Sequence, residues 1–228
     1  VYRMCAAPAR TRRLRPPDVW GIIGAARFTD ERSHVMHAMI TIDHPWQKSF
    51  NFAILDAVRR GLEASGCTVD VLDLNRDGFN PVMTVEELAV YTRGGALDPK
   101  VTEYQQRIAH SDHLIYIFPV WWEVMPALLK GFFDKVFLPE WAFAEEDASP
   151  LLTHIRTGTA ITTMGAPRPI YTSVERVLCK GILEFCGVQR NRWINCCEVS
   201  QVSYEQRCMW LDEVEAYARS LAAPDHPA

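Results

Sequence analysis

Two kinds of hydrophobic pattern alternate along the chain from Met36 onward. Short runs of β-branched and other apolar residues predict strands, and longer stretches with apolar residues every three or four positions predict helices. The predicted strands cover residues 37–43, 67–74, 113–118, 158–163 and 191–197. The predicted helices cover residues 50–65, a short helix from 84, 98–110, 126–138, 173–186 and 203–221. Strands that alternate with helices predict an α/β fold, a parallel sheet with helices on both faces.

The first 35 residues differ from the rest of the sequence. They hold seven Arg against three acidic residues, and the remainder carries a net charge of −8. We expect residues 1–35 to be a disordered or spurious extension before a native start at Met36, with a targeting segment as the alternative. The folded domain is predicted to span residues 36–221, followed by a tail at 222–228. An acidic body argues against nucleic acid as a partner.

The cysteines and the longest apolar run limit the cellular context. The seven cysteines include no Cys-x-x-Cys pair, a pattern that favours reduced, mostly buried thiols in the cytoplasm over disulfides or a metal site. The longest apolar run, Leu114 to Trp122, has nine residues and contains Pro119. It is too short to cross a bilayer, so we expect no membrane insertion.

Three distinctive loops follow the first, third and fourth predicted strands. They are His44–Ser49, Pro119–Val124 and Met164–Tyr171. In doubly wound sheets the ligand lies beyond the carboxyl ends of the strands, where these loops meet. The sequence therefore predicts one binding site built from all three loops.

The first loop has the chemistry of an anion site. It brings the imidazole of His44, the ammonium of Lys48 and the hydroxyl of Ser49 to the start of a predicted helix. Helix amides and the positive end of the helix dipole add to the attraction for a phosphate monoester. The loop has neither a Gly-x-Gly-x-x-Gly fingerprint nor a P-loop. The simpler alternative is a helix capped by Ser49 beside a solvated histidine.

The other two loops suit a flat ligand. Trp121 and Trp122 cannot both enter the sheet core, so one is expected to line a cleft or an interface, although a pair buried against the next helix is the alternative. In the third loop, Gly165 allows the backbone to approach a planar ring closely, and an ordinary strand-to-helix turn is the alternative.

Together these motifs resemble the flavodoxin-like NAD(P)H:quinone oxidoreductases. The resemblance rests on His-Pro-x-x-x-Ser-Phe-Asn at 44–51, on the run from Phe118 to Phe137 and on Thr-Thr-Met-Gly-Ala-Pro at 162–167. It extends from about Met36 to Leu221. The resemblance implies a doubly wound five-stranded parallel sheet with strand order 2-1-3-4-5.

The resemblance also implies roles for particular residues. The flavin phosphate and ribityl chain would be held by the first loop and the start of its helix: His44, Lys48, Ser49, Phe50 and Asn51. The flavin ring would be bordered by residues of the second and third loops: Pro119, Val120, Trp121, Trp122, Thr162, Thr163, Met164 and Gly165. Tyr171 falls close to a family tyrosine beside the flavin and is the candidate catalytic residue.

Trp141 and Phe143 match aromatic residues that reach the partner's site in family dimers. After a helix whose inner face already uses several large residues, both rings have no obvious place in the same core, which independently suggests an interface. They are therefore expected to shape the substrate pocket of a homodimer.

The function that the resemblance implies is hydride transfer from NAD(P)H through a bound flavin to a quinone or a similar small-molecule acceptor. FMN is expected over FAD because the chain lacks the longer C-terminal region of the animal type. Two alternatives remain: a flavin-binding regulatory subunit of a transporter and an electron-carrier flavodoxin. No metal is expected.

Overall fold

The computed structural model describes residues 35–167 and 173–222. The predicted tail 222–228 and the predicted extension 1–35 therefore lie outside the described residues, except for Ala222 and Val35. The strands are β1 (His37–Ile42), β2 (Thr68–Asp73), β3 (His113–Pro119), β4 (Thr157–Thr163) and β5 (Arg190–Cys196). The helices are α1 (Phe50–Ala64), α2 (Val85–Val90), η1 (Tyr91–Arg93), α3 (Pro99–Ala109), α4 (Ala127–Val136), η2 (Glu175–Glu184) and α5 (Tyr204–Ser220).

The five strands form one parallel sheet in the order β2-β1-β3-β4-β5, which confirms the predicted fold class. The register brings the carboxyl ends of the central strands to one edge. Ile42 pairs with Ile117 near the end of β3, and Pro119 pairs with Thr163 at the end of β4. The loops that follow β1, β3 and β4 therefore leave the sheet side by side.

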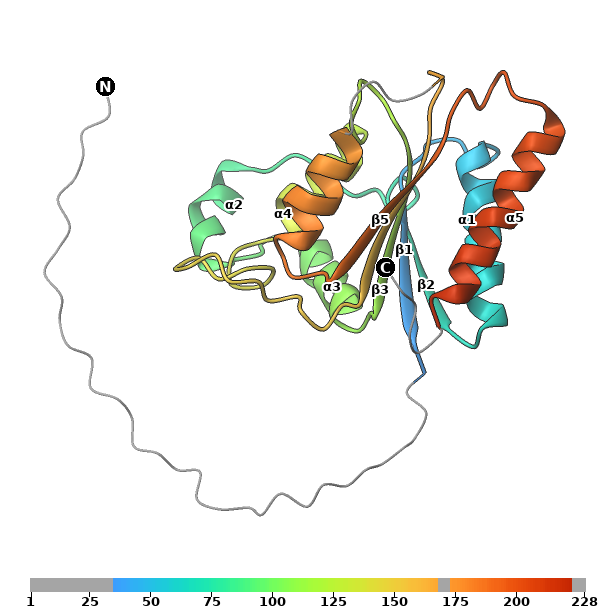
Figure 1. The fold of residues 1–228 in the computed structure, drawn as a ribbon. Helices are drawn as coiled ribbons and strands as arrows, with labels where there is room; N and C mark the ends of the chain where they lie inside the picture. Colours follow the sequence, from blue (N-terminus) through green and yellow to red (C-terminus); the bar gives the residue numbers. More distant parts are fainter. Residues whose placement is uncertain (1–34, 168–172, 223–228) are drawn as a thin grey trace, which may run out of the picture. The chain divides into compact units, whose positions relative to one another are not determined.

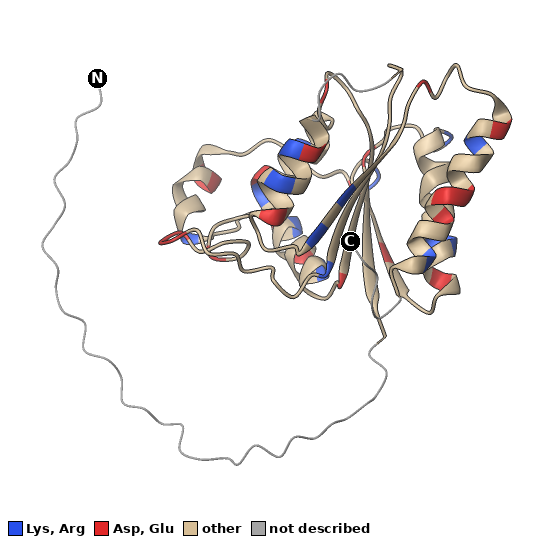
Figure 2. Ribbon diagram, viewed as in Figure 1, with Lys and Arg blue, Asp and Glu red and all other residues tan. Residues whose placement is uncertain are grey.

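Helices cover both faces of this sheet (Figure 1). α1 and α5 pack together on one face, and α3, α4 and η2 lie on the other. β3 and β4 are buried along their whole length because both of their faces are covered. Most charged residues lie on the helices and loops around this core (Figure 2).

Two core clusters correspond to the two faces. The cluster under α1 and α5 includes Ile40, Ile54 and Val214. The larger cluster, on the face of α3, α4 and η2, is rich in aromatic rings, with Phe132 in contact with Phe133 at 5.5 Å between ring centroids. The amphipathic spacing that predicted the helices thus places their apolar sides on the sheet.

Local signals in the sequence had mixed outcomes. The short helix predicted from residue 84 forms as α2, and a capping box opens it, since Thr84 and Glu87 each bond the other's backbone amide. The predicted helix 173–186 forms, but Glu175–Glu184 has π-type rather than α-type hydrogen bonding. Ser49 stands at the N-cap of α1, as the alternative of a capped helix requires, but its side chain makes no capping hydrogen bond.

Two further observations concern the membrane and the cysteines. Among the described residues, no helix combines the length and the apolar character that a membrane span requires. Four cysteines are buried in the core, in agreement with the expectation of mostly buried thiols: Cys67, Cys179, Cys186 and Cys196.

Candidate functional site

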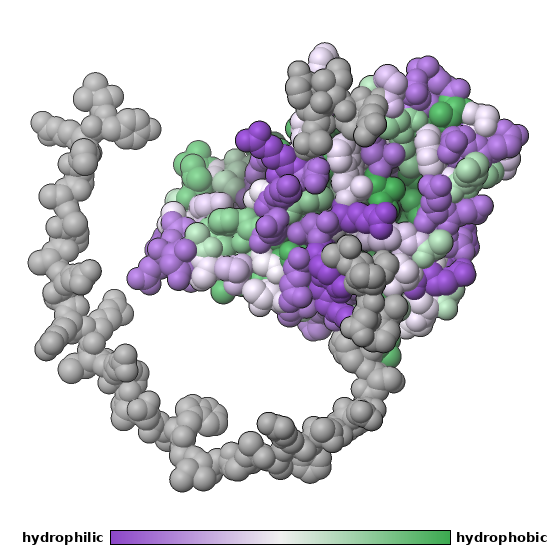
Figure 3. Space-filling model, viewed as in Figure 1, coloured by the Kyte–Doolittle hydropathy of each residue, from purple (hydrophilic) through white to green (hydrophobic). Residues whose placement is uncertain are grey.

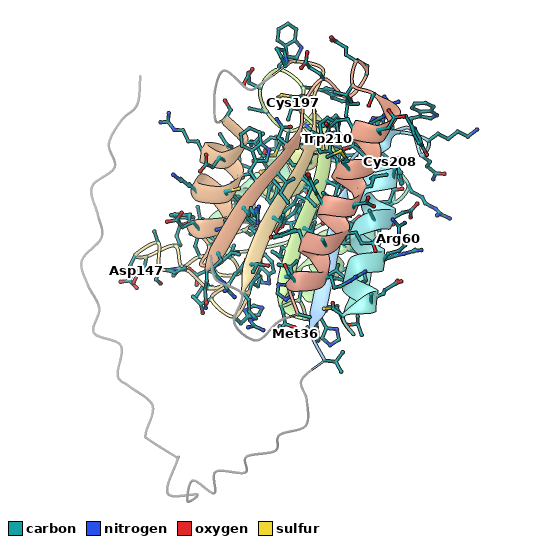
Figure 4. All side chains as sticks on the ribbon, turned by 45° about the vertical axis from the view of Figure 1, so that its right-hand side comes forward. Met36, Arg60, Asp147, Cys197, Cys208 and Trp210 are labelled. Carbon is teal, nitrogen blue, oxygen red and sulfur yellow. The ribbon has the colours of Figure 1, made fainter. Side chains whose placement is uncertain are left out.

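The candidate site lies at the edge of the sheet where the strands end. Cys197 directly follows β5 at this edge, and Met36 directly precedes β1 at the opposite edge (Figure 4). The three loops singled out from the sequence all leave from the edge near Cys197, because they follow the carboxyl ends of parallel strands.

Ser49 is the polar residue of the first loop that most clearly lacks a partner. Its side chain is only 8% exposed, and its hydroxyl has no hydrogen-bond partner within the described chain. Its backbone amide is used, since it donates to the carbonyl of Trp46 at 3.0 Å. The first amides of α1, which have no acceptor inside a helix, begin at the next residue. A buried hydroxyl without a partner is costly unless a ligand supplies one.

His44 supplies a donor to the same loop. Its Nδ1 accepts a hydrogen bond from the amide of Trp46 at 3.0 Å, so the proton of the neutral ring resides on Nε2. Partial burial lowers the pKa of His44, which also favours this neutral form. Lys48 is exposed, and its ammonium adds positive charge beside the loop. Together, these groups are the donors that this loop offers to an anion at the start of α1.

The second loop is a tight turn that presents two tryptophans. The amide of Trp121 donates to the carbonyl of Val124 at 3.0 Å, and the amide of Val124 donates back at 3.2 Å. The two residues between them, Trp122 and Glu123, have φ values of 51° and 68°. This is a type I′ turn without glycine, a strained choice for these residues.

Both tryptophan rings face outward from this turn. Trp121 is 49% exposed and Trp122 is 96% exposed, so the alternative of a pair buried against the next helix is wrong. The amide of Trp121 is already used within the turn, so it is not free to bond a ligand. Of the strand-end residues before the turn, Pro119 is buried and Val120 is half-buried, with its amide bonded to the carbonyl of Thr163.

The third loop is fixed to the end of β5. The amide of Met164 donates to Cys196, and the carbonyl of Met164 accepts from the amide of Val199 at 3.2 Å. Met164 itself is buried. A Cβ atom built on Gly165 meets no atom within 4 Å, so its Cα faces open space. The described part of this loop thus leaves a small, open residue beside a rigid strand end.

The two threonines at the end of β4 point to opposite faces of the sheet, as neighbours in a strand must. Thr163 accepts a hydrogen bond from the side-chain amide of Asn51 at 3.0 Å. This contact links the first turn of α1 to β4, and both residues are buried. Thr162 instead donates to Asn195 at 2.8 Å and accepts from Trp193 at 2.8 Å. The structure therefore brings Thr163, but not Thr162, together with the first loop.

Sequence reasoning missed a buried acid at the end of β1. Asp43 accepts a hydrogen bond from Asn75 at 2.8 Å and another from the amide of Leu129 at 2.9 Å. Burial raises the pKa of Asp43. An acid that ends a strand next to a candidate anion loop was the available signal, since carboxylates are rarely buried without partners.

The remaining predicted residues lie apart from these loops or outside the described chain. Trp141 packs on Phe137 at 5.8 Å, and Phe143 packs on Phe185 at 5.1 Å between ring centroids. Both are half-buried at the edge of the larger core cluster, so the expectation that they have no place in that core is wrong. Tyr171 lies outside the described residues.

The residues of this site match the chemistry of a flavin. The unpartnered hydroxyl of Ser49, the Nε2 proton of His44 and the first amides of α1 match a phosphate monoester. The outward indole rings and the open face of Gly165 suit a flat ring system. A doubly wound sheet with such a site at its carboxyl edge defines a protein of the flavodoxin-like class.

Comparison with known proteins gives the family. The family model described as flavodoxin-like fold matches residues 36–218, and the chain belongs to this family. The chain is 28% identical over 183 residues to rat NAD(P)H dehydrogenase [quinone] 1, covering 68% of this chain and 66% of the rat protein. The chain thus spans slightly less than two-thirds of that curated relative.

Two solved structures extend the comparison. Smu.1420 from Streptococcus mutans is 32% identical, with a TM-score of 0.74, and the match covers 81% of this chain and all of that one. The NAD(P)H:quinone oxidoreductase from Methanothermobacter marburgensis is 27% identical, with a TM-score of 0.75, and the match covers 84% of this chain and all of that one.

Proposed function

We propose that this protein is a flavin-dependent NAD(P)H oxidoreductase that reduces a quinone or a similar two-electron acceptor. The family match, the relatives with NAD(P)H and quinone in their names, and the site geometry support the proposal together. A bound flavin supplies the redox chemistry, because it accepts a hydride from a nicotinamide and passes two electrons to an acceptor.

The observation that carries the proposal is the unpartnered hydroxyl of Ser49 at the start of α1. It is buried, it does not cap its own helix, and a donor from His44 lies in the same loop. Such a group is costly unless a ligand oxygen or an ordered water meets it, and the start of a helix favours an anionic ligand. We take that ligand oxygen to belong to the phosphate of FMN.

The other residues have supporting roles in this proposal. The hydrogen bond between Asn51 and Thr163 holds the first turn of α1 against β4. It therefore fixes the first loop, His44–Ser49, which we call the phosphate loop, relative to the third loop. The exposed rings of Trp121 and Trp122 offer flat surfaces that exclude water from one side of the site. None of these side chains is required to act as a nucleophile.

We further propose a homodimer in which Trp141 and Phe143 contribute to the substrate pocket. Phe143 lines a groove of about 460 Å³ together with Phe133, Val177 and Phe185. Apolar residues also lie on the surface around α2, where Val85 and Leu88 are exposed (Figure 3). Surfaces of this kind are typical of interfaces.

The proposal extends to location and domain limits. The cysteine pattern supports the cytoplasm, since four described cysteines are buried and none of the spacing suggests a disulfide framework. The flavin-binding unit is residues 36–221, and the family match to 36–218 supports these limits.

Nothing specific favours the regulatory subunit or the electron-carrier flavodoxin, because the relatives are oxidoreductases with NAD(P)H in their names.

A visible spectrum and a turnover assay test the proposal directly. The purified protein, supplied with FMN and then passed through a desalting column, is expected to retain about one FMN per chain and to bleach on addition of NADH or NADPH. A quinone such as menadione should restore the colour repeatedly. A protein that retains no FMN at micromolar concentration would end the flavin hypothesis. A yellow protein that is reduced but does not turn over quinone would instead support an electron carrier.

A further inference from the structure

Asp43 joins three segments at the carboxyl edge of the sheet. Its backbone amide donates to the carbonyl of Ile117 on β3 at 3.0 Å, which fixes the residue beside the central strand. One carboxylate oxygen accepts from the side-chain amide of Asn75 in the loop after β2, at 2.8 Å. The other accepts from the backbone amide of Leu129 in the first turn of α4, at 2.9 Å. The side chain is 3% exposed.

The bond to Leu129 takes the place of a helix cap. The N-cap of α4 is Pro126, whose side chain has no acceptor and makes no capping hydrogen bond. Leu129 is the third residue of the helix, the position that an N-cap side chain normally serves. Asp43 therefore caps α4 from a distant strand, and its charge lies at the positive end of that helix dipole.

The start of α4 is close in sequence to the turn Trp121–Val124, which we call the tryptophan turn. Only Met125 and Pro126 separate Val124, the last residue of the turn, from the first residue of α4. Met125 is buried, and proline has a restricted backbone. A shift of the first turn of α4 would therefore be transmitted to Trp121 and Trp122.

We propose that Asp43 is a positioning residue, which holds the tryptophan turn in register with the phosphate loop by capping α4 and binding Asn75. This inference rests on the proposed function, because it concerns how the two walls of the flavin site are held relative to each other. The residue next to Asp43 in the chain is His44 of the phosphate loop, so the same strand end serves both walls.

Hydrogen bonding, rather than charge, should carry this role. An asparagine at position 43 can still accept from Leu129 through its oxygen. Its amide nitrogen can donate to Asn75 if the Asn75 side chain turns over by 180°, because an amide offers both a donor and an acceptor. Asp43→Asn therefore preserves both contacts, whereas Asp43→Ala removes both. The matched control is Asp73→Ala, since Asp73 ends the neighbouring strand and, within the described residues, its side chain bonds only the amide of Arg76 in its own loop.

The experiment has one arm without flavin and one arm with it. In the flavin-free protein, amide hydrogen exchange is measured at Leu129, Trp121 and Val124. In the FMN complex, the dissociation constant and the visible circular dichroism of the flavin are measured. Asp43→Ala should increase exchange at all three amides and weaken FMN binding by about tenfold, because without both hydrogen bonds the two walls of the site would no longer be held in register. Its flavin dichroism should also change, whereas Asp43→Asn and Asp73→Ala should match the wild type.

Two results would contradict the positioning role of Asp43. Wild-type exchange and dichroism in Asp43→Ala would overturn it. A loss in Asp43→Asn as large as in Asp43→Ala, at an unchanged thermal midpoint, would also overturn it, because the charge and not the hydrogen bonds would then matter. If Asp43→Ala does not fold, Asp43→Ser takes its place, since its hydroxyl is too short to reach Leu129. If the wild type takes up no flavin, the proposed function fails, and the exchange arm still tests the link from Asp43 to the turn.

Discussion

The two walls of the candidate site, the phosphate loop and the tryptophan turn, offer a ligand different kinds of contact. The phosphate loop, His44–Ser49, is polar and leads into the start of a fifteen-residue helix, with one buried hydroxyl left without a partner. The tryptophan turn, Trp121–Val124, is apolar and outward-facing, and its two central residues have left-handed backbone angles. The first wall has unused hydrogen-bonding capacity, and the second has unused hydrophobic surface.

Because of this difference, we expect one wall to determine the affinity for the cofactor and the other to determine which substrates react with it. Groups that donate to a phosphate make strong, directional bonds far from any reacting atom, so they should determine how tightly the cofactor is held. Exposed indole rings make weaker and less directional contacts, so they should determine what approaches the flavin ring. Changes in the two walls are therefore expected to affect different measurements.

The largest effect is expected in the phosphate loop. Ser49→Ala combined with Asn51→Ala removes the hydroxyl donor and also the contact between Asn51 and Thr163, so FMN affinity should fall by roughly a hundredfold. Ser65→Ala at the other end of α1 is the control, because that hydroxyl bonds only to local groups. Isothermal titration with FMN gives the comparison. Equal affinities in the double variant and the wild type would place the phosphate elsewhere.

The largest contribution to the acid sensitivity of the protein should come from a residue outside both walls. His113, at the start of β3, is buried, and burial lowers the pKa of this histidine from 6.5 to about 4. Between these two values the unfolded chain binds a proton that the folded chain does not. The free energy of unfolding should therefore fall as the pH falls from 6.5 to 4, by about 3 kcal/mol in total.

Urea unfolding at a series of pH values measures this loss, with His113→Gln as the comparison. The variant should lose much less stability over the same pH range, although its absolute stability is lower. An identical pH dependence in both proteins would assign the acid sensitivity to other groups. His44 belongs among those groups, since its pKa is also lowered by burial.

The proposed dimer should affect turnover and not cofactor binding. Trp141→Ser with Phe143→Ser should reduce quinone turnover by about tenfold at full flavin occupancy, because these rings would border the partner's substrate pocket. A modest fall in the thermal midpoint is also expected, as both rings pack against the core. Tyr204→Ser removes an exposed aromatic residue elsewhere and serves as the control. A wild type that stays monomeric and fully active at nanomolar concentration would exclude the composite pocket.

The smallest effect is expected in the tryptophan turn. Trp122→Gly relieves the left-handed strain at a residue with φ of 51°, so the free energy of unfolding should rise by about 1 kcal/mol. The same change removes a stacking surface, so the KM for a quinone should rise about fivefold, while FMN affinity stays within twofold of the wild type. If FMN affinity falls as far as in the Ser49→Ala, Asn51→Ala double variant, the tryptophan turn also determines cofactor affinity, and the proposed separation of roles is wrong.

The sequence predicted the architecture well because its signals are periodic and local. The strands and the helices follow from patterns that depend on neighbouring residues, whereas the strand order 2-1-3-4-5 came from the family resemblance. The three loops were also found, because the carboxyl ends of parallel strands must meet at one edge. A pattern of this kind locates a site without fixing the direction of any side chain.

The details that escaped prediction depend on residues distant in the chain. Thr162 turns toward Trp193 and Asn195 because β5 lies beside β4, and no local signal reveals this pairing. Asp43 reaches the amide of Leu129, 86 positions later, to cap a helix that lacks a cap of its own. Such contacts arise only after the strands are in register.

The central claim is that the start of α1 holds the phosphate of a flavin. The most direct test compares the affinities of FMN and riboflavin, which differ only in that phosphate. The account predicts that FMN binds the wild-type protein roughly a hundredfold more tightly than riboflavin, and that Ser49→Ala reduces the ratio several-fold. Equal affinities for FMN and riboflavin in the wild type would contradict the account.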